Sequence, residues 1–474
     1  MFSNSFRWLR AGAAAASLAT LTACGVFDDD DDPAPPPPVA QAQLRVIHAS
    51  ADTPAVDIFI NGTRALPGVT FGAASAFNAV PAGATRVQVS LAGQAAASAA
   101  IDVSAPLTAG RDYTAIAVGS GATGPTRLQA VLIDDAGTAP AAGQVKLRVV
   151  HGAPAVPGVD IFVTAPNDAL PAMPTIAALQ FGQQAPAAAQ PALSVPAGSY
   201  RVRARVAGQT AIAFDSGPLQ LAAGTDAVVV AVPDAGPSLS PIQLLLAPKG
   251  AAAALVRDSR AALRIAHFSP TVPAVDVFLK APGEANAVGN RALSSVSFPQ
   301  DSGFLAVPAG TYDASVALTG SLAGVLNLNG AALARGSSTS VLAIGLLNGT
   351  GAQALRLAAF ADDRAPVAGQ AKVRVIHLSP DAPAVDVVVV TGGSISSRPV
   401  TNLAFPNATA SALTLPPATY RLGVTAAGGT TVIAAQDFTL AAGDVVTIAA
   451  IGCLATSGAC AGGQAFQFKV LNDR

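Results

Sequence analysis

The chain carries little charge for its length. Only 12% of its 474 residues are charged, and the formal net charge is −1. Proteins that bind nucleic acid present a basic patch or stripe, so we expect no nucleic-acid partner.

Tryptophan is nearly absent, with Trp8 as its one occurrence, and there are four tyrosines. Protein-binding hot spots favour Trp, Tyr and Arg, so arginine would have to supply them here. The densest arginine stripe is Arg201, Arg203 and Arg205. The alternative interpretation of this stripe is a strand face exposed to solvent.

Histidine is equally scarce, and its four occurrences mark a repeat. The repeats read LRVIHASADTPAVDIFI, LRVVHGAPAVPGVDIFV, LRIAHFSPTVPAVDVFL and VRVIHLSPDAPAVDVVV, starting at Leu44, Leu147, Leu263 and Val373. Each has an Arg, a His three residues later, a Pro six after the His and an Asp nine after it. We call this frame the signature; its His and Asp residues are His48 and Asp57, His151 and Asp160, His267 and Asp276, and His377 and Asp386.

The spacing of the signatures predicts the domains. Successive histidines lie 103, 116 and 110 residues apart, a length that can bury its own core and exceeds the roughly 20–50 residues of solenoid repeats. Each unit contains about seven short β-rich runs separated by turn residues, which favours an antiparallel sandwich. We therefore expect an all-β chain of four tandem immunoglobulin-like antiparallel β-sandwich domains at 44–138, 144–247, 261–362 and 371–474.

A second marker in each unit predicts a shared corner. It reads Val-Pro-Ala-Gly or a close variant and is followed by Tyr200, Tyr312 and Tyr420, with Thr85 in the first unit. This resembles a tyrosine corner, in which the hydroxyl bonds to a nearby backbone group. The linkers after the first and third units are also alike, which indicates that a two-domain unit was duplicated.

The N-terminus predicts export. Arg7 and Arg10 precede an apolar run that ends at Cys24, as in a secretory signal at residues 1–23. Leu21-Thr22-Ala23-Cys24 resembles the lipobox of bacterial lipoproteins, which implies cleavage before Cys24, acylation of that residue and attachment to a membrane; an ordinary signal with a chance Cys is the alternative. Gly25 favours the outer membrane. Residues 24–43, rich in Asp and Pro, are expected to be a disordered tether, or else an acidic metal-binding tail.

The complete signature, from His377 to Val387, resembles the bacterial family known as domain of unknown function 4397. The resemblance covers essentially everything after residue 42. It implies an exported protein of tandem units, and it supplies no catalytic residues. The first and second copies depart from it: Ala51 replaces the Pro after Ser50, and the second copy has Ala153 in place of the Ser.

The His and Asp of the signature have three interpretations. They can fasten the first turn through hydrogen bonds, contact a ligand or ion, or take part in catalysis. Zinc needs three or four ligands, and each unit offers one His and one repeated Asp. A serine nucleophile is disfavoured because the second copy lacks it. We predict a structural role, with the amides of the turn as partners of the Asp, and no cofactor.

Two cysteines remain after Cys24. Cys453 and Cys460 lie close together in an exported chain, which predicts a disulfide; a metal or redox pair is the alternative.

Together these features predict a lipid-anchored, non-enzymatic protein of the cell envelope that serves in surface interaction, adhesion or spacing, with a surface protein or glycan as a possible partner. The alternatives are an envelope protein that binds a small ligand or ion through the His–Asp turns, and an envelope hydrolase.

Overall fold

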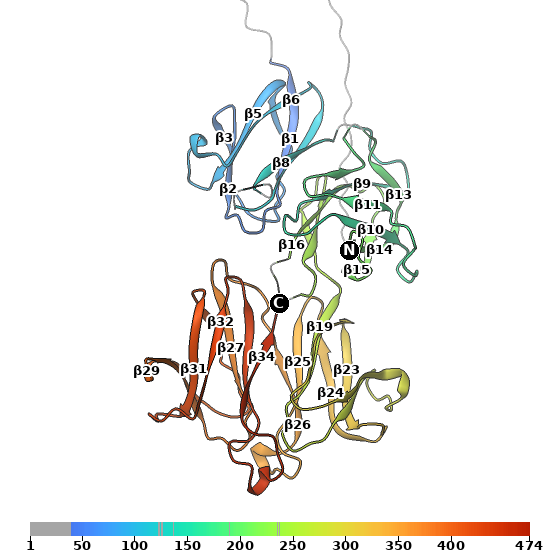
Figure 1. The fold of residues 1–474 in the computed structure, drawn as a ribbon. Coiled ribbons are helices and arrows are strands. Elements are labelled where there is room, and N and C mark those ends of the chain that lie inside the picture. The colour runs from blue at the N-terminus through green and yellow to red at the C-terminus, as the bar shows by residue number, and fades with distance from the viewer. Residues whose placement is uncertain are drawn as a thin grey trace, which may run out of the picture. The chain divides into compact units, whose positions relative to one another are not determined.

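The structure, a computed structural model, describes residues 39–474 except 122, 123, 125, 126, 136, 189, 235 and 237. The predicted signal at 1–23, the lipid site Cys24 and the tether as far as residue 38 lie outside the described residues. The regular secondary structure of the described part is almost entirely β-strand, which confirms the predicted all-β class (Figure 1). It contains four short 3₁₀ turns: η1 (Ala96–Ser98), η2 (Val288–Asn290), η3 (Gly351–Gln353) and η4 (Gly458–Cys460). Within it, no helix has the length and apolarity required to span a bilayer.

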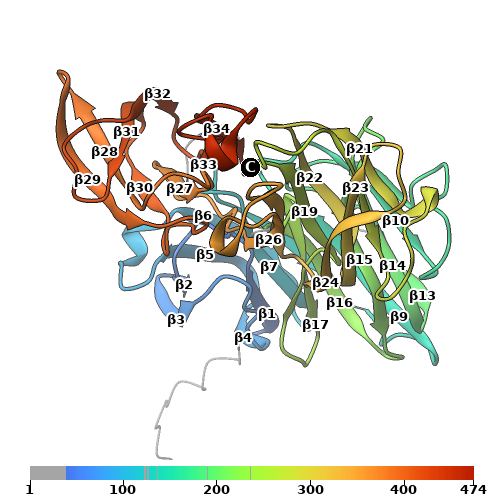
Figure 2. The ribbon, with the colours of Figure 1, turned by 90° about the horizontal axis from the view of Figure 1, so that it is seen from below.

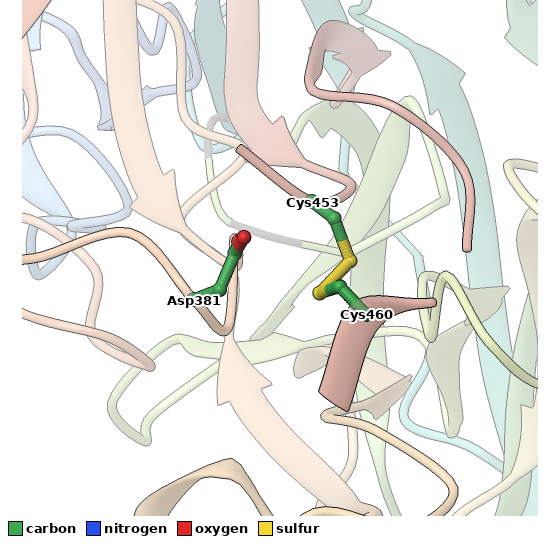
Figure 3. A group of neighbouring side chains, drawn as sticks. All are labelled: Asp381, Cys453 and Cys460. Atoms are coloured by element: carbon green, nitrogen blue, oxygen red, sulfur yellow. A yellow bond between two sulfur atoms is a disulfide. The ribbon is translucent and has the colours of Figure 1, made fainter. Parts of the chain in front are cut away.

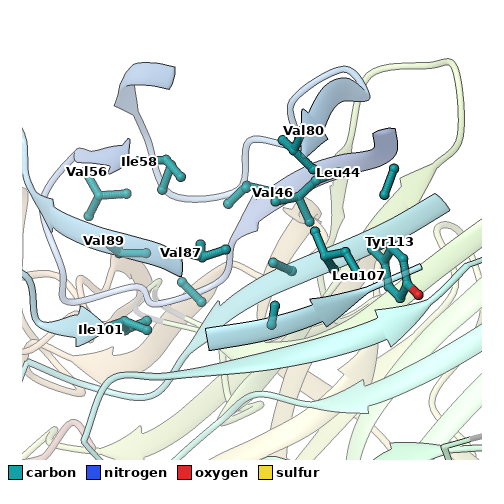
Figure 4. Close-up of a cluster of buried hydrophobic side chains, with 14 of the residues drawn as sticks. Leu44, Val46, Val56, Ile58, Val80, Val87, Val89, Ile101, Leu107 and Tyr113 are labelled. Atoms are coloured by element: carbon teal, nitrogen blue, oxygen red, sulfur yellow. The ribbon is translucent and has the colours of Figure 1, made fainter. Parts of the chain in front are cut away.

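The first sandwich consists of two four-stranded sheets, ordered β4-β1-β7-β8 and β3-β2-β5-β6. Its strands are β1 (Gln41–His48), β2 (Val56–Ile60), β3 (Thr63–Val69), β4 (Asn78–Pro81), β5 (Gly83–Leu91), β6 (Ile101–Leu107), β7 (Asp112–Val118) and β8 (Gln129–Asp134). Leu44, Val46, Val87 and Val89 project from both sheets into one apolar core (Figure 4).

The second sandwich has a larger first sheet, in which two short strands share the edge beside β9. The sheets are ordered β12-β9-β16-β17-β18, with β13 also on β9, and β11-β10-β14-β15. Figure 2 labels β9, β13, β16 and β17 of the first sheet and β10, β14 and β15 of the second. The strands are β9 (Gln144–His151), β10 (Val159–Thr164), β11 (Ile176–Leu179), β12 (Gln184–Ala185), β13 (Leu193–Pro196), β14 (Gly198–Val206), β15 (Ile212–Leu221), β16 (Asp226–Pro233), β17 (Ile242–Pro248) and β18 (Ala254–Val256).

The third and fourth sandwiches repeat the arrangement of the first. Their sheets are β22-β19-β25-β26 with β21-β20-β23-β24, and β30-β27-β33-β34 with β29-β28-β31-β32. The third contains β19 (Arg260–His267), β20 (Val275–Lys280), β21 (Arg291–Val296), β22 (Asp301–Pro308), β23 (Gly310–Leu318), β24 (Gly324–Leu333), β25 (Ser338–Ile344) and β26 (Arg356–Ala361). The fourth contains β27 (Ala371–His377), β28 (Val385–Thr391), β29 (Ser394–Leu403), β30 (Leu413–Leu415), β31 (Ala418–Ala426), β32 (Ala434–Leu440), β33 (Val445–Ile451) and β34 (Gln467–Asn472).

Each sandwich also contains a parallel pair, which the expected purely antiparallel arrangement did not include. The first strand of each unit lies parallel to the seventh strand or its equivalent, as β1 does to β7 and β27 to β33. Parallel neighbours need a long crossover. Here the strands between β1 and β7 form that crossover: β2, β3, β5 and β6 belong to the opposite sheet, and β4 pairs with the other edge of β1.

Two strand positions differ from the sequence expectation. β1 begins at Gln41, three residues before Leu44, because Gln41 and Ala42 pair with Pro81 and Val80 of β4. β18 lies between the predicted second and third domains, at 144–247 and 261–362, and it pairs with β17 through Leu244 and Val256. In both places alanine and glutamine give little strand signal of their own, and pairing with a neighbouring strand decides their conformation.

The last residues of the first strand are buried on both faces in the first, third and fourth units, because the sandwiches share cores in pairs. Alternate residues of β1 enter its own core, while Ile47 packs with Val150, Val230 and Leu245 of the second sandwich. The third and fourth sandwiches share a second such core, which includes the following residues: Ala266, Phe268, Leu342, Ile344, Ile376, Leu378, Ala449 and Ile451. This packing groups the units as first with second and third with fourth.

The predicted corner is confirmed in every copy. The hydroxyls of Tyr200, Tyr312 and Tyr420 donate to the carbonyl of the Pro four residues earlier at 2.7, 2.8 and 2.9 Å. In the first copy Thr85 Oγ1 makes the same bond to Pro81 at 2.5 Å. The bond therefore needs a hydroxyl at this position, and the ring is dispensable.

The cores of the sandwiches are not filled equally. The third and fourth contain voids of about 20 and 10 Å³. The second contains a cavity of about 300 Å³ between its two sheets. At about 24 cal/mol per Å³ of residual cavity, an empty space of that size would cost about 7 kcal/mol, within the range of the whole stability of a domain.

Candidate functional site

The signature histidine closes the turn that follows the first strand. His48 is fully buried, and its Nε2 lies 3.1 Å from the carbonyl of Pro54, six residues later. Its Nδ1 accepts the backbone N–H of Ser50 at 3.3 Å. The Nε2 contact recurs at 3.0–3.1 Å in His151, His267 and His377. The Pro of the signature is therefore the acceptor that the His needs.

One neutral tautomer satisfies both contacts, with the proton on Nε2 and a lone pair on Nδ1. Burial lowers the pKa of all four histidines below 6.5, although the proline carbonyl favours the charged form. The third copy is looser: within the described residues, Nδ1 of His267 is buried without a hydrogen-bond partner. In the other three copies the neutral ring binds backbone groups through both nitrogens and so holds the turn closed.

The signature serine is also used inside the fold. Ser50 and Ser269 are fully buried, and their hydroxyls donate to the carbonyls of Gly119 and Gly345 at 2.8 and 2.6 Å. These glycines follow the parallel strand, so the serine attaches the turn to it. The second copy can carry Ala153 because the His accepts a backbone N–H there too, at 3.3 Å.

The signature aspartate lies on the next strand, and its carboxylate accepts hydrogen bonds from groups that the His does not contact. Asp57 is buried and accepts the N–H of Gly68 at 2.8 Å and of Gly93 at 3.0 Å, and Arg64 Nε lies 3.4 Å from it. The sequence predicts the amides of the turn itself as its partners, and this prediction is wrong. The amides come instead from β3 and from the hairpin between β5 and β6.

The residue that donates to this aspartate has a left-handed backbone in every copy. It is Gly68, Ala178, Ser295 or Asn402, with φ between 47° and 62°. The strand register shifts beside each aspartate, which marks a β-bulge. The carboxylate therefore stabilises a strained bulge on the edge strand.

The backbone amides lower the pKa of Asp57, Asp276 and Asp386, most strongly through Gly68, Ser295 and Asn402 respectively. In the second copy Asp160 is only partly buried and receives the single amide of Ala178. The His and Asp of one signature thus bind different backbone groups on different elements. In the part of the chain that the structure describes, the one group of His, Cys, Asp or Glu close enough to hold a metal includes no signature His or Asp.

The signature arginine, for which the sequence offered no role, connects paired sandwiches. Arg264 of the third is 1% exposed, and its Nη1 donates to Asp473 of the fourth at 2.6 Å. In return Arg374 of the fourth pairs with Asp362 of the third and donates to the Ala361 carbonyl at 2.8 Å. Burial raises the pKa of Asp362, and Arg374 opposes that rise. We call these crossed pairs the arginine lock.

The first pair of sandwiches has an asymmetric version of the lock. Arg45 donates to the carbonyl of Pro248 in the second sandwich at 3.1 Å and lies 3.4 Å from Asp135 of its own sandwich. Lys249 stands where the other units have an Asp, and its Nζ donates to the Asp135 carbonyl at 2.7 Å. Arg148, left without that Asp, binds the carbonyl of Gln190. The signal in the sequence was an Arg in all four signatures and an Asp at the end of three units.

The cysteine pair is a disulfide, as predicted. Cys453 and Cys460 are bonded and buried, and Leu346 of the third sandwich packs against them. Asp381, the aspartate of the fourth turn, lies beside them (Figure 3), and its oxygens accept the N–H groups of Leu454 and Ala455 at 2.8 Å. Because both sulfurs are bonded to each other, this group offers no thiolate to a metal.

The arginine stripe is only partly a solvated face. Arg201 pairs with the buried Asp215, its Nε donating at 2.8 Å. Arg203 is 6% exposed and donates to Thr164 Oγ1 at 2.7 Å and to the Asp168 carbonyl at 2.9 Å. The loop after β10 therefore covers the middle of the stripe, which leaves it unsuited to act as a binding patch.

These repeated turns, bulges and corners define the class of protein: a tandem array of β-sandwich units that share one architecture. The model of the family described as domain of unknown function (DUF4397) matches residues 42–162 and 261–388, which together make up more than half of the chain. The chain belongs to this family.

Comparison with other proteins adds no function. No curated protein matches the chain. Among solved structures, the Bacillus anthracis TIE protein is similar with a TM-score of 0.16 and 11% identity, over 83% of this chain and 65% of that one. A leucine-rich repeat protein from Bacteroides thetaiotaomicron VPI-5482 is similar with a TM-score of 0.12 and 13% identity, over 40% of this chain and 26% of that one.

Proposed function

We propose that the protein is a non-enzymatic module of the bacterial cell envelope, held by a lipid on Cys24 and serving in surface interaction, adhesion or spacing. The observation that supports this most is the use made of the signature. In the first, third and fourth copies, the His, Ser and Asp side chains that could carry chemistry are buried and bonded to backbone groups or to one another. The repeated residues are thus accounted for by folding.

The shared cores of paired sandwiches also favour a mechanical or display role. A pair joined by apolar packing and an arginine lock is less free to reorient than domains joined by a linker alone. The N-terminal features that resemble a lipoprotein signal supply the anchor in this proposal, and the outer membrane is its expected location. A surface protein or glycan is the expected partner.

The anchor can be tested on the intact protein in its own cells. We expect an alkyne-labelled fatty acid to be incorporated into the wild type and not into Cys24→Ala, and the wild type to sediment with membranes. Cys453→Ala/Cys460→Ala, which leaves Cys24 in place, is the matched control and should be labelled. Label in Cys24→Ala, or an unlabelled wild-type chain in the cytoplasm, would refute the anchor.

The role can be tested by cross-linking on the same cells, followed by mass spectrometry. A discrete and reproducible partner would identify an interaction module, whereas links restricted to the chain itself would identify a spacer. The metal hypothesis is tested separately by thermal unfolding with added Zn²⁺ or Ca²⁺. Stabilisation that His377→Ala removes would contradict the structural role we assign to that ring.

A further inference from the structure

The cavity of the second sandwich lies between its two sheets. Residues of β9, β13, β16, β17 and β18 line one wall, and residues of β10, β11, β14 and β15 line the other. All of the lining side chains are hydrocarbon except Thr175 and Tyr200. The polar atoms of these two are already bonded, Thr175 Oγ1 to the Val163 N–H at 3.0 Å and the Tyr200 hydroxyl to Pro196 at 2.7 Å. The cavity thus offers shape and apolar contact, and no charged group to hold a polar ligand.

The other sandwiches serve as internal controls for this space. Val149 and Val229 face each other across β9 and β16 and are half-buried. The equivalent residues of the other three units are buried: Val46 and Ala115, Ile265 and Val341, and Val375 and Ile448. The same architecture can therefore close its core, and the second copy does not.

Three features of the sequence account for the open core. Ala204 lies opposite Ile161, where the other units have the larger Val89, Val316 and Val424. The edge strand β11 has four residues, whereas its equivalents have six to ten. The segment from Phe181 to Gly198 is also five residues longer than the corresponding segments of the first and third units. The small side chain of Ala204, the short edge strand β11 and the longer segment together leave the space between the sheets open.

The opening lies along the edge formed by β11 and β13. Thr175 and Pro196 line the cavity and are also exposed, whereas Val159, Phe214 and Leu221 line it and are buried. Apolar cavities of about 150 Å³ stay free of water and bind molecules the size of benzene. A cavity of about 300 Å³, open at one edge, can take a longer apolar molecule.

We propose that the second sandwich binds an aliphatic chain, on the order of ten to fifteen carbon atoms long, between its sheets. The site needs no charge on the ligand, so any head group stays at the β11–β13 edge. The same chain chemistry can come from a free fatty alcohol or acid, or from a lipid. This inference is independent of the proposed envelope role, since the cavity belongs to one sandwich and uses none of the signature's His–Asp contacts.

The test uses the full chain and the uncharged fluorescent probe N-phenyl-1-naphthylamine. We expect saturable binding of one probe per chain, with displacement by dodecanol. Ala204→Leu should fill the space, weaken probe binding by about tenfold or more, as loss of an apolar pocket does, and raise the melting temperature. Ser199→Leu, which places the same side chain at an exposed position of the same strand, should change neither.

Other outcomes decide the proposal as well. Displacement by a twelve-carbon lysophosphatidylcholine as strong as by dodecanol would assign a lipid source, and displacement by dodecanol alone would assign a free molecule. If Ala204→Leu fails to fold, Ala204→Val, the residue of the other units, replaces it and should weaken binding to a lesser degree. Probe binding that is unsaturable, that involves several probes per chain, or that both Ala204 variants leave unchanged would overturn the proposal.

Discussion

Replacing Arg264 by Met should destabilise the third and fourth sandwiches far more than the loss of one contact suggests. Arg264 and Asp473 have side chains 1% and 4% exposed and are 2.6 Å apart. Arg264 also stacks over Phe304, with its guanidinium 4.1 Å from the ring centroid. Removing it leaves the buried Asp473 carboxylate with Thr447 Oγ1 as a hydrogen-bond donor at 2.6 Å and with the buried Arg364 guanidinium as a nearby positive charge. Breaking a buried pair costs about 3–5 kcal/mol, because the remaining charge is desolvated; we expect the lower end of that range here, since Arg364 still offsets part of the charge on Asp473.

A surface pair on the same chain provides the control. Arg86 and Asp102 are 2.5 Å apart, closer than the buried pair, and their side chains are 59% and 39% exposed. Arg86→Met should shift the urea midpoint far less than Arg264→Met, because water solvates the remaining carboxylate. Distance alone ranks the two pairs in the opposite order, so the comparison isolates the effect of burial.

The assay is urea unfolding followed by hydrogen exchange and mass spectrometry, which reports the peptides of each sandwich separately. In the cycle of Arg264→Met, Asp473→Leu and the double variant, we expect the double to cost less than the sum of the singles by about 2 kcal/mol, since residues in one network couple. Equal costs for Arg264→Met and Arg86→Met, or strictly additive singles, would refute the view that desolvation dominates the lock.

Three further predictions concern the disulfide and the titrating groups. Cys453→Ala/Cys460→Ala should lower the unfolding free energy of the fourth sandwich by about 2.5 kcal/mol, from the closed loop of about eight residues; an unchanged urea midpoint would contradict this. Because the buried histidines have a pKa below their unfolded value of 6.5, the unfolded chain takes up protons first, and stability should fall below that pH by up to about 1.4 kcal/mol per pH unit for each ring; urea midpoints that stay level down to about pH 5 would refute the assignment of neutral rings. The pKa of Asp276 lies below 3.8, so its stabilising effect is present above that pH and is lost as pH falls through the lowered pKa; Asp276→Asn should be less stable than wild type near neutrality, and a difference that persists in strong acid would contradict this origin.

The sequence alone was sufficient for the class of fold, the repeat, the corner and the disulfide. Each depends on residues close together in the chain: alternating or continuous apolar runs between turns, a hydroxyl four residues after a Pro, and two cysteines seven positions apart. Local spacing determines such features because their partners can hardly lie elsewhere. The family resemblance, which rests on the residues from His377 to Val387, was also correct. These residues are close together in the chain because they form one turn.

Only the tertiary structure decided which surfaces are buried and what each signature residue binds. Asp57 bonds amides 11 and 36 residues away, and Arg264 reaches Asp473 at a separation of 209. No local pattern encodes those distances, because pairing of strands and packing of whole sandwiches bring the groups together. The cavity beside Ala204 likewise depends on the separation of two sheets and on the lengths of their edge strands. A single small residue predicts no void until the packing around it is known.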